Sequence, residues 1–243
     1  MTLAAAGSES SMFAVISDDE TGQKLGFGAP HLRPLFSVLN PELTYTVNKW
    51  HTACGACDMM AHSLEPYFTT SEETSLTDGF IEALLRGVIA AAPKALQEPA
   101  NYQARATLMW ASTMSMSMIF SVGRDGDMVP HGVGEEMGGR FDLTHGATLS
   151  AILPAWMEYH YKNNLPRFVQ YAHNVWGVPL DICHPEDVAL EGIRRTRAFF
   201  QSMGLPVTLT QLGADVNKID EMAENIETDW ADVPGLFFSL DTQ

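Results

Sequence analysis

The stretch HTACGACDMMAH, which begins at His51, contains the ligand types of two different kinds of site. Cys54 and Cys57 form a CxxC pair, which suits soft metals or thiol exchange. Asp58 and His62 form a DxxxH pair, which suits a harder catalytic metal ion. On a helix that advances about 100° per residue, His51, Cys54, Asp58 and His62 share one face, with Cys57 close by. Helical geometry alone therefore leaves both sites open.

The thiol site needs more than the chain supplies. A structural zinc site built on CxxC requires two further soft or imidazole ligands, and the remaining cysteine, Cys183, stands alone at the expected start of another helix. A redox-active CxxC sits at a helix N-terminus, whereas Cys54 falls about two turns inside its expected helix. Cysteine is also a common core residue. We therefore favour the carboxylate pair and keep a thiol switch at Cys54 and Cys57 as the weaker alternative.

Two histidines further along the chain can complete a metal site with Asp58 and His62. His131 and His145 lie in VPHGVGEEMGGRFDLTHGATLSAILPAW, where a short helix and the turn FDLT allow the chain to reverse. One carboxylate and three imidazoles form a complete ligand set for Fe²⁺ or Zn²⁺, with room for a substrate oxygen. A single helical histidine is more often structural, so the combination carries the prediction. The remaining histidines have no such arrangement and are interpreted as structural or solvated: His31, His51, His160, His173 and His184.

Composition restricts the partners and the compartment. The 243-residue chain is 46% hydrophobic and has 30 acidic against 14 basic residues, a formal charge of −16. Such a chain can bury a sizeable core, and its field repels nucleic acid and anionic membrane surfaces. It has no apolar run of bilayer length, no signal-peptide pattern and too few cysteines for a disulfide framework. We expect a soluble cytoplasmic protein that binds neither nucleic acid nor membrane.

The N-terminal residues differ in texture from the rest of the chain. AAAGSES and DDETGQK are typical of turns, and FAVIS and LFSVL are typical of short strands. Beyond them, apolar residues recur at helical spacing, starting with a helix that Thr46 would cap and Pro66 would end. Further helices are expected near residues 77–96, 102–122, 131–138, 145–161, 165–176, 185–203 and 217–226. The predicted fold is mostly α, one helical domain with a small β-containing N-terminal piece.

Four segments resemble the iron-containing (group III) alcohol dehydrogenases, particularly their butanol dehydrogenase-like and NADPH-dependent aldehyde reductase branch. They are TLAAAGSESSMFAVIS, LNPELTYTV, DMMAHSLEPYF and HGVGEEMGGRFDLTHGATLSAILPAWMEYHY, and the similarity covers essentially the whole chain. The resemblance implies a dehydroquinate synthase-like fold, in which an α/β nucleotide-binding domain precedes a helical metal-binding domain. Residues 1–45 would be a remnant of the edge of the first domain, and residues 46–243 would be the helical metal-binding catalytic domain.

The resemblance also implies an activity and a set of site residues. The activity is that of a metal-dependent, NAD(P)-linked oxidoreductase that interconverts primary alcohols and aldehydes by hydride transfer, with Fe²⁺ or Zn²⁺ polarising the substrate oxygen. Family members tend to form homodimers, which we expect here. The positions of Cys54 and Cys57 are not ligands in the family. The implied metal ligands are Asp58, His62, His131 and His145, and the implied NAD(P) contacts are Thr2, Leu43 and Thr46.

Three departures from the family pattern qualify that activity. The chain begins inside the turn that corresponds to AAAGSES and lacks the glycine loop that binds the pyrophosphate. We therefore expect a truncated form, also shortened after PGLFFSLDTQ, that exposes apolar surface. Glu135 stands where the family has another histidine; it could accept a proton as a catalytic residue or, like Glu136, be a solvated helix residue. Ala6 replaces a threonine that contacts the cofactor. The alternative function is a non-catalytic, metal-binding helical scaffold or subunit.

Overall fold

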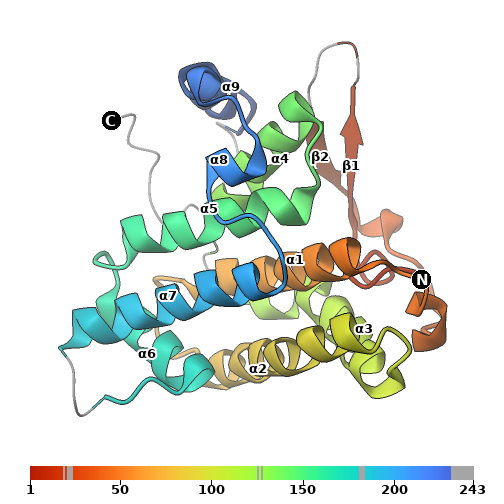
Figure 1. The fold of residues 1–243 in the computed structure, drawn as a ribbon, viewed down its shortest axis with the longest axis horizontal. Coiled ribbons are helices and arrows are strands. Elements are labelled where there is room, and N and C mark those ends of the chain that lie inside the picture. The colour runs from red at the N-terminus through yellow and green to blue at the C-terminus, as the bar shows by residue number, and fades with distance from the viewer. Residues whose placement is uncertain (19, 21–23, 125, 127, 181–183, 231–243) are drawn as a thin grey trace.

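The computed structural model describes residues 1–18, 20, 24–124, 126, 128–180 and 184–230. Helices dominate these residues, and the β structure among them is one two-stranded antiparallel sheet (Figure 1). The predicted mostly α fold with a small β-containing N-terminal piece is therefore confirmed. No helix in the described part of the chain is both long enough and apolar enough to cross a bilayer.

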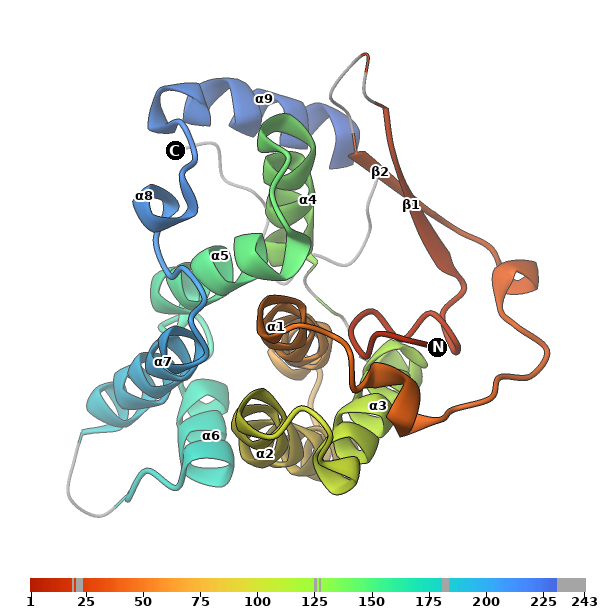
Figure 2. The same ribbon diagram turned by 45° about the vertical axis from the view of Figure 1, so that its right-hand side comes forward.

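Helix α1 (Lys49–Tyr67) lies at the centre of the molecule. Figure 2 shows it nearly end-on, between α2 (Ser75–Gln97) and α3 (Tyr102–Met116) on one side and α5 (His145–His160) on another, and it contacts all three. Its residues from 52 to 61 are all buried, because small and apolar side chains surround the helix rather than forming one stripe. A helix buried on every side can present polar side chains only into the interior, which suits an internal site.

Both ends of α1 differ from the sequence-based prediction. The cap is Asn48 rather than Thr46, because the Asn48 side chain accepts a hydrogen bond of 2.8 Å from the backbone N–H of His51. Pro66 does not end the helix but lies inside its last turn. The helix then closes at Phe68, whose N–H bonds the carbonyl oxygen of Leu64.

The chain reverses between α4 (Val129–Phe141) and α5, as the turn FDLT predicted. Asp142 ends α4 in the left-handed conformation, with φ of 50°, and Thr144 occupies the N-cap position of α5. Helix α4 packs against α5, and its outer side is covered by β2 (Lys24–Gly28) and α9 (Ile219–Trp230). The reversal brings both His131, near the start of α4, and His145, at the start of α5, close to α1.

The remaining helices agree with the predicted ranges to within a few residues. Helices α6 (Leu165–Trp176) and α7 (Pro185–Ser202) pack together, and α6 also contacts α2. The predicted third helix is too long: α3 ends at Met116, because Met118 adopts a left-handed conformation before a short 3₁₀ turn. The short helix α8 (Leu209–Leu212) was not predicted. Cys183, expected at the start of α7, lies outside the described residues.

The N-terminal piece is an antiparallel hairpin followed by irregular chain. FAVIS forms β1 (Phe13–Ser17) as predicted and pairs with β2, with Val15 opposite Gly26. The prediction of a strand at LFSVL was wrong. Leu35, Phe36 and Val38 are between 74% and 101% exposed, so no buried face holds that segment in an alternating conformation. These side chains provide the exposed apolar surface that the sequence led us to expect.

Candidate metal centre

One oxygen of Asp58 is surrounded by three imidazoles. Its Oδ1 lies 3.6 Å from Nε2 of His62, 3.6 Å from Nε2 of His131 and 3.7 Å from Nε2 of His145. Candidate ligand atoms of Asp58, His62 and His131 all lie within 4.8 Å of one another. The rings of His62 and His131 stack at 4.1 Å between centroids. The four residues that the sequence brought together as a candidate metal site therefore converge in space, from helices α1, α4 and α5.

Glycines allow those helices to approach closely. A Cβ built on Gly146 would lie 2.2 Å from the carbonyl oxygen of Cys54, so the first turn of α5 rests directly on the backbone of α1. A Cβ on Gly134 would lie 3.0 Å from Oγ1 of Thr148, where α4 meets α5. A side chain at either position would hold the helices further apart. Small residues in the sequence thus set the distances between the candidate ligands.

The donor atoms and their charges fit a divalent cation. Oδ1 of Asp58 and Nε2 of His131 are buried and have no hydrogen-bond partner within the described chain. Burial lowers the pKa of His145 to about 4, and burial with the nearby His131 lowers that of His62 to about 3, so both rings are neutral at pH 7. Neutral imidazoles and a carboxylate are the forms that bind metal. Buried polar atoms without partners are the expected signature of a site completed by an ion.

The local field also favours a cation. Burial alone lowers the pKa of His131, but the carboxylates of Glu65 and Asp58 outweigh burial and raise this pKa to about 10. A field that holds a proton on a buried imidazole is strongly negative, and it attracts a metal ion for the same reason. Of these two carboxylates, Glu65 was not identified from the sequence.

Glu65 lies on the far side of the His131 ring from Asp58. It is fully buried, its Oε1 accepts a hydrogen bond of 3.1 Å from the backbone N–H of His131, and its Oε2 lies 2.6 Å from Nδ1 of the ring. The sequence signal that could have found it is its position three residues after His62, on the helix that carries two candidate ligands. A carboxylate at this spacing is easily dismissed as a surface residue.

Glu135, the proposed catalytic residue, is buried beside the cluster. It is 8% exposed, and its Oε2 has no hydrogen-bond partner in the described part of the chain. Burial raises its pKa, although His131 and Lys24 partly oppose this effect. Lys24 and Gly26 of β2 lie against α4, where Lys24 also lowers the pKa of His145. The solvated interpretation of Glu135 is thus wrong, and Glu136, also buried, pairs with Arg140 at 3.0 Å.

The CxxC pair is not arranged for thiol chemistry. Cys54 and Cys57 are buried and free. Burial and then the negative charge of Asp58 raise the pKa of Cys54 to about 12, and burial raises that of Cys57 well above its ordinary value. Thiolates are the reactive and metal-binding form, and both thiols remain protonated at neutral pH. The structure therefore favours the carboxylate pair over the thiol pair.

The residues predicted to bind NAD(P) lie on the surface of the N-terminal part. Thr2, Leu43 and Thr46 are exposed, and none of them hydrogen-bonds to the metal cluster among the described residues. Leu43 belongs to a 3₁₀ turn (Pro41–Thr44) that packs against α3. Their accessibility is compatible with contact to a cofactor, and the assignment stays a prediction.

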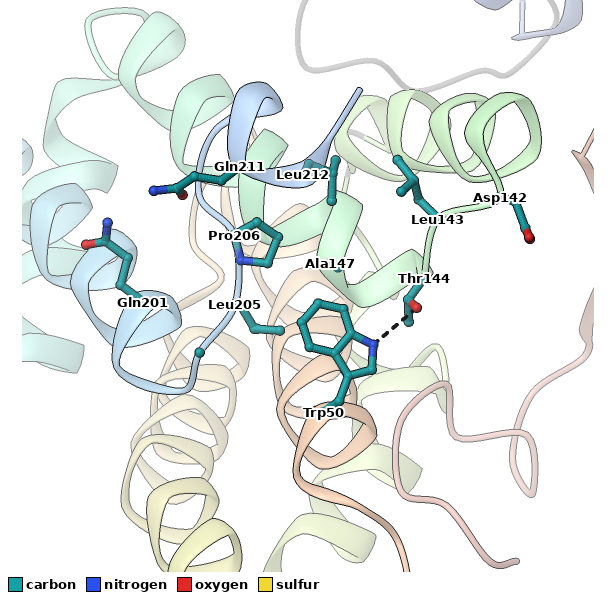
Figure 3. Close-up of a pocket in the computed structure, with 11 residues that line it drawn as sticks. Trp50, Asp142, Leu143, Thr144, Ala147, Gln201, Leu205, Pro206, Gln211 and Leu212 are labelled. Carbon is teal, nitrogen blue, oxygen red and sulfur yellow. Dashed lines mark hydrogen bonds between the residues drawn. The ribbon is translucent and has the colours of Figure 1, made fainter. Parts of the chain in front are cut away.

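A pocket of about 540 Å³ opens beside this centre, between the start of α5 and the segment around α8 (Figure 3). The indole of Trp50 lines one side and donates a hydrogen bond of 3.2 Å from Nε1 to Oγ1 of Thr144. Gln201 and Gln211 line the opposite side. None of the four candidate ligands lines it. The pocket is therefore separate from the metal cluster.

Comparison with known proteins identifies the family. A model of the Fe-containing alcohol dehydrogenase family, C-terminal, matches residues 52–231. The chain is 41% identical over 225 residues to NADH-dependent butanol dehydrogenase A of Clostridium acetobutylicum, covering 92% of this chain and 58% of that protein. It is 35% identical over 228 residues to NADPH-dependent aldehyde reductase YqhD of Escherichia coli, covering 93% and 58%.

A solved structure supports the same relationship. The crystal structure of E. coli K-12 YqhD superposes with a TM-score of 0.91 at 34% identity, covering 95% of this chain and 58% of that one. The chain thus spans a little under three fifths of the length of these relatives. By sequence match, by fold and by the helices that carry the cluster, this chain belongs to the iron-containing alcohol dehydrogenase family.

Proposed function

We propose that this chain provides the metal-binding catalytic part of an NAD(P)-linked oxidoreductase that interconverts primary alcohols and aldehydes. The observation that carries the proposal is the convergence of Asp58, His62, His131 and His145, in which three Nε2 atoms lie 3.6–3.7 Å from one carboxylate oxygen. The names of the relatives, butanol dehydrogenase and aldehyde reductase, supply the substrate class. Fe²⁺ or Zn²⁺ suits this ligand set.

When bound, the metal would act as a Lewis acid on the substrate oxygen, and NAD(P) would exchange hydride with the adjacent carbon. The chain's own contribution is one carboxylate and three imidazoles: those of His62 and His145 are already neutral at pH 7, and that of His131 would give up a proton to the solvent when the cation binds. His131 is 3% exposed at its side chain, whereas His62 and His145 are 12% and 25% exposed, so substrate approaches from the side of His62 and His145. Water reaches His131 poorly, because its ring is 3% exposed and contacts the fully buried Glu65.

Glu135 is proposed as the group that takes up or returns the hydroxyl proton. It lies one helical turn after His131 on α4 and has an unpartnered, buried Oε2 within the described structure. Burial raises its pKa above the ordinary value of a glutamate, which favours uptake of a proton by this carboxylate. His131 and then Lys24, which approaches from β2, partly oppose this rise.

The cofactor and the assembly are inferred from the family. Residues 1–45 would form the edge of a nucleotide-binding domain, and Thr2, Leu43 and Thr46 would contact NAD(P) there. Residues 46–243 would form the metal-binding domain. A homodimer in the cytoplasm is the expected form. The exposed apolar side chains of Leu35 and Phe36 support the proposal that another part of the protein or a second copy covers this N-terminal surface.

The test is metal content and dinucleotide binding of the purified 243-residue chain beside a His131→Ala, His145→Ala double variant. A His31→Ala, His51→Ala double variant is the matched control, because it removes two exposed imidazoles outside the cluster. We expect near-stoichiometric iron or zinc in the unaltered chain and the control, and its loss in the first variant. NAD(P)H oxidation with short aldehydes, measured on the same samples, tests the activity.

Each outcome separates the candidate functions. Bound metal with NAD(P)H affinity supports the oxidoreductase. Bound metal without measurable dinucleotide affinity supports the non-catalytic metal-binding scaffold, for which the motivating observation is that the chain spans 58% of the length of these relatives. Absence of metal from the unaltered chain contradicts both.

A further inference from the structure

Glu65 makes two contacts with a single residue. Its Oε1 accepts the backbone N–H of His131 at 3.1 Å, and its Oε2 lies 2.6 Å from Nδ1 of the same residue. Both oxygens thus point at His131 rather than at the centre of the cluster, and Glu65 does not belong to the group of ligand atoms within 4.8 Å. Because this buried carboxylate contacts both the backbone N–H and the ring of His131, it fixes the position of the backbone and of the ring of that histidine.

The backbone contact supplies what the start of α4 lacks. The N-cap residue Met128 makes no side-chain capping bond, Pro130 has no N–H, and the first N–H bonded within the helix is that of Gly132, to the carbonyl oxygen of Met128. The N–H of His131 would therefore be left without an acceptor in a buried position. Glu65 supplies that acceptor from α1, and its negative charge lies at the positive end of the α4 dipole.

The ring contact decides which nitrogen faces the cluster. Opposite the ionised carboxylate of Glu65, whose Oε2 is 2.6 Å away, Nδ1 carries the hydrogen, because two lone pairs at that distance would repel each other. Nε2 is then the nitrogen that faces Oδ1 of Asp58, at 3.6 Å, and it can present a lone pair to a cation. Carboxylate, histidine and metal in this order are a recurrent way of fixing a ligand's tautomer and orientation.

From these contacts we infer that Glu65 is a positioning residue of the metal centre, which acts through His131 and does not itself bind the ion. The inference rests on the proposed function, because it concerns how the chain holds the proposed metal. This role requires a carboxylate at position 65, and the amide of a glutamine cannot replace it. The backbone N–H and the Nδ1–H of His131 both need acceptors, whereas a glutamine amide offers one acceptor oxygen and places N–H groups against the second donor.

The experiment compares the affinity of the full chain for Zn²⁺ with that of Glu65→Gln, by competition against a chromophoric chelator. The matched control is Glu82→Gln. Glu82 is a buried glutamate that accepts hydrogen bonds from Tyr67, Gln170 and Asn174 and has no contact with the cluster. We expect affinity to fall about 10–100-fold in Glu65→Gln and to stay unchanged in Glu82→Gln. Cobalt substitution provides a second readout, because the visible spectrum of Co²⁺ reports a change in the ligand set.

A measurement on the unaltered chain keeps the inference testable if Glu65→Gln does not fold. In protein labelled with ¹⁵N-histidine, and with His131 assigned by its loss in His131→Ala, we expect the metal-bound ring to carry its hydrogen on Nδ1. A hydrogen on Nε2, or equal Zn²⁺ affinities in Glu65→Gln and the unaltered chain, overturns the role of Glu65 alone. Failure of the unaltered chain to bind Zn²⁺ overturns the proposed metal function and, with it, this inference.

Discussion

Gly146 lies against the carbonyl oxygen of Cys54, so closely that a Cβ on Gly146 would be 2.2 Å from that oxygen. The contact is one residue away from His145 and one helical turn away from Asp58. It therefore sets the separation of α5 from α1 at the level of the candidate metal ligands. Neither residue is a ligand, yet the pair determines whether Nε2 of His145 can reach within 3.7 Å of Oδ1 of Asp58.

Replacing Gly146 with alanine should push α5 away from α1. A contact of 2.2 Å with backbone atoms cannot be relieved by rotating a side chain, so the helix itself has to move. We expect a loss of about 1–3 kcal/mol in the free energy of unfolding, together with weaker metal binding. Urea unfolding and Zn²⁺ competition on the same preparation measure the two effects.

Gly79→Ala is the matched control for this prediction. Gly79 also lies in a helix, α2, but a Cβ there would have nothing within 4 Å. Alanine should therefore stabilise the chain by up to about 1 kcal/mol, because glycine has more conformational freedom to lose on folding. If the two substitutions changed the free energy of unfolding equally, the close contact at Gly146 would not be what sets the distance between α1 and α5.

Removing the metal should destabilise the fold around α1, α4 and α5. A ligand that binds the folded state alone contributes RT ln(1 + [L]/Kd), which is about 2.7 kcal/mol when the free ion is at about 100 times Kd. We expect this stabilisation on adding Zn²⁺ to the metal-free chain, and its reversal by a chelator. Asp58→Asn keeps the shape of the side chain but removes the charge, and should abolish most of the effect. Unfolding midpoints that do not depend on Zn²⁺ would contradict a preformed site.

The sequence predicted the convergence of the candidate ligands better than it predicted the contacts that hold them in place. The spacings of Asp58 and His62, and of His131 and His145, are visible because few residue types bind metals and helical periodicity places them on known faces. The reversal between α4 and α5 follows from the turn FDLT. These features are local in sequence, or depend on residue chemistry that is independent of the fold.

The features that were missed depend on contacts between distant segments. Glu65 is separated from His131 by 66 positions, and its spacing from His62 does not show which residue its carboxylate contacts. The segment LFSVL has the composition of a strand but lies on the surface without a partner strand among the described residues. Strand formation depends on pairing with another strand and on a buried face, and a five-residue segment alone predicts neither.

Substitution of Arg124 should test how much the buried ion pairs of Asp78 contribute to stability. Arg124 is fully buried at its side chain, pairs with Asp78 and also donates to the carbonyl oxygen of Pro66, the residue after Glu65. Arg124→Met removes one partner of a buried ion pair, and we expect a loss of about 3–5 kcal/mol in the free energy of unfolding. Guanidinium unfolding measures this loss.

The exposed pair between Lys162 and Glu186 is the control for that prediction. Its nitrogen and oxygen lie 3.9 Å apart, and both side chains are more than half exposed. Lys162→Met should change the free energy of unfolding by less than about 1 kcal/mol, because exposed pairs are screened by water and salt. If Arg124→Met costs as little stability as Lys162→Met, Arg167, the second partner of Asp78, is sufficient to balance the charge of that carboxylate.

The stability of the metal-free chain should have a maximum near pH 6.5, the ordinary pKa of histidine. The pKa of His131 is raised to about 10 in the folded chain, so its stabilising contribution is fully present below pH 6.5 and is lost as the pH rises toward 10. The pKa values of His62 and His145 are lowered to about 3 and 4. As the pH falls below 6.5, these two histidines therefore take up protons in the unfolded chain before they do so in the folded chain. Acid thus destabilises the folded state as well.

Urea midpoints from pH 4 to pH 10, measured with a chelator present, test both limbs of this profile. The replacement His131→Gln should flatten the alkaline limb, because it removes the group whose proton is lost there. It should make the acid limb shallower without removing it, because burial still lowers the pKa values of His62 and His145. His62→Gln should make the acid limb shallower, with the His145 contribution remaining, and should leave the alkaline limb in place. If neither variant alters the profile, the titration of the cluster is not coupled to folding, and the negative field around His131 is weaker than the positions of Glu65 and Asp58 indicate.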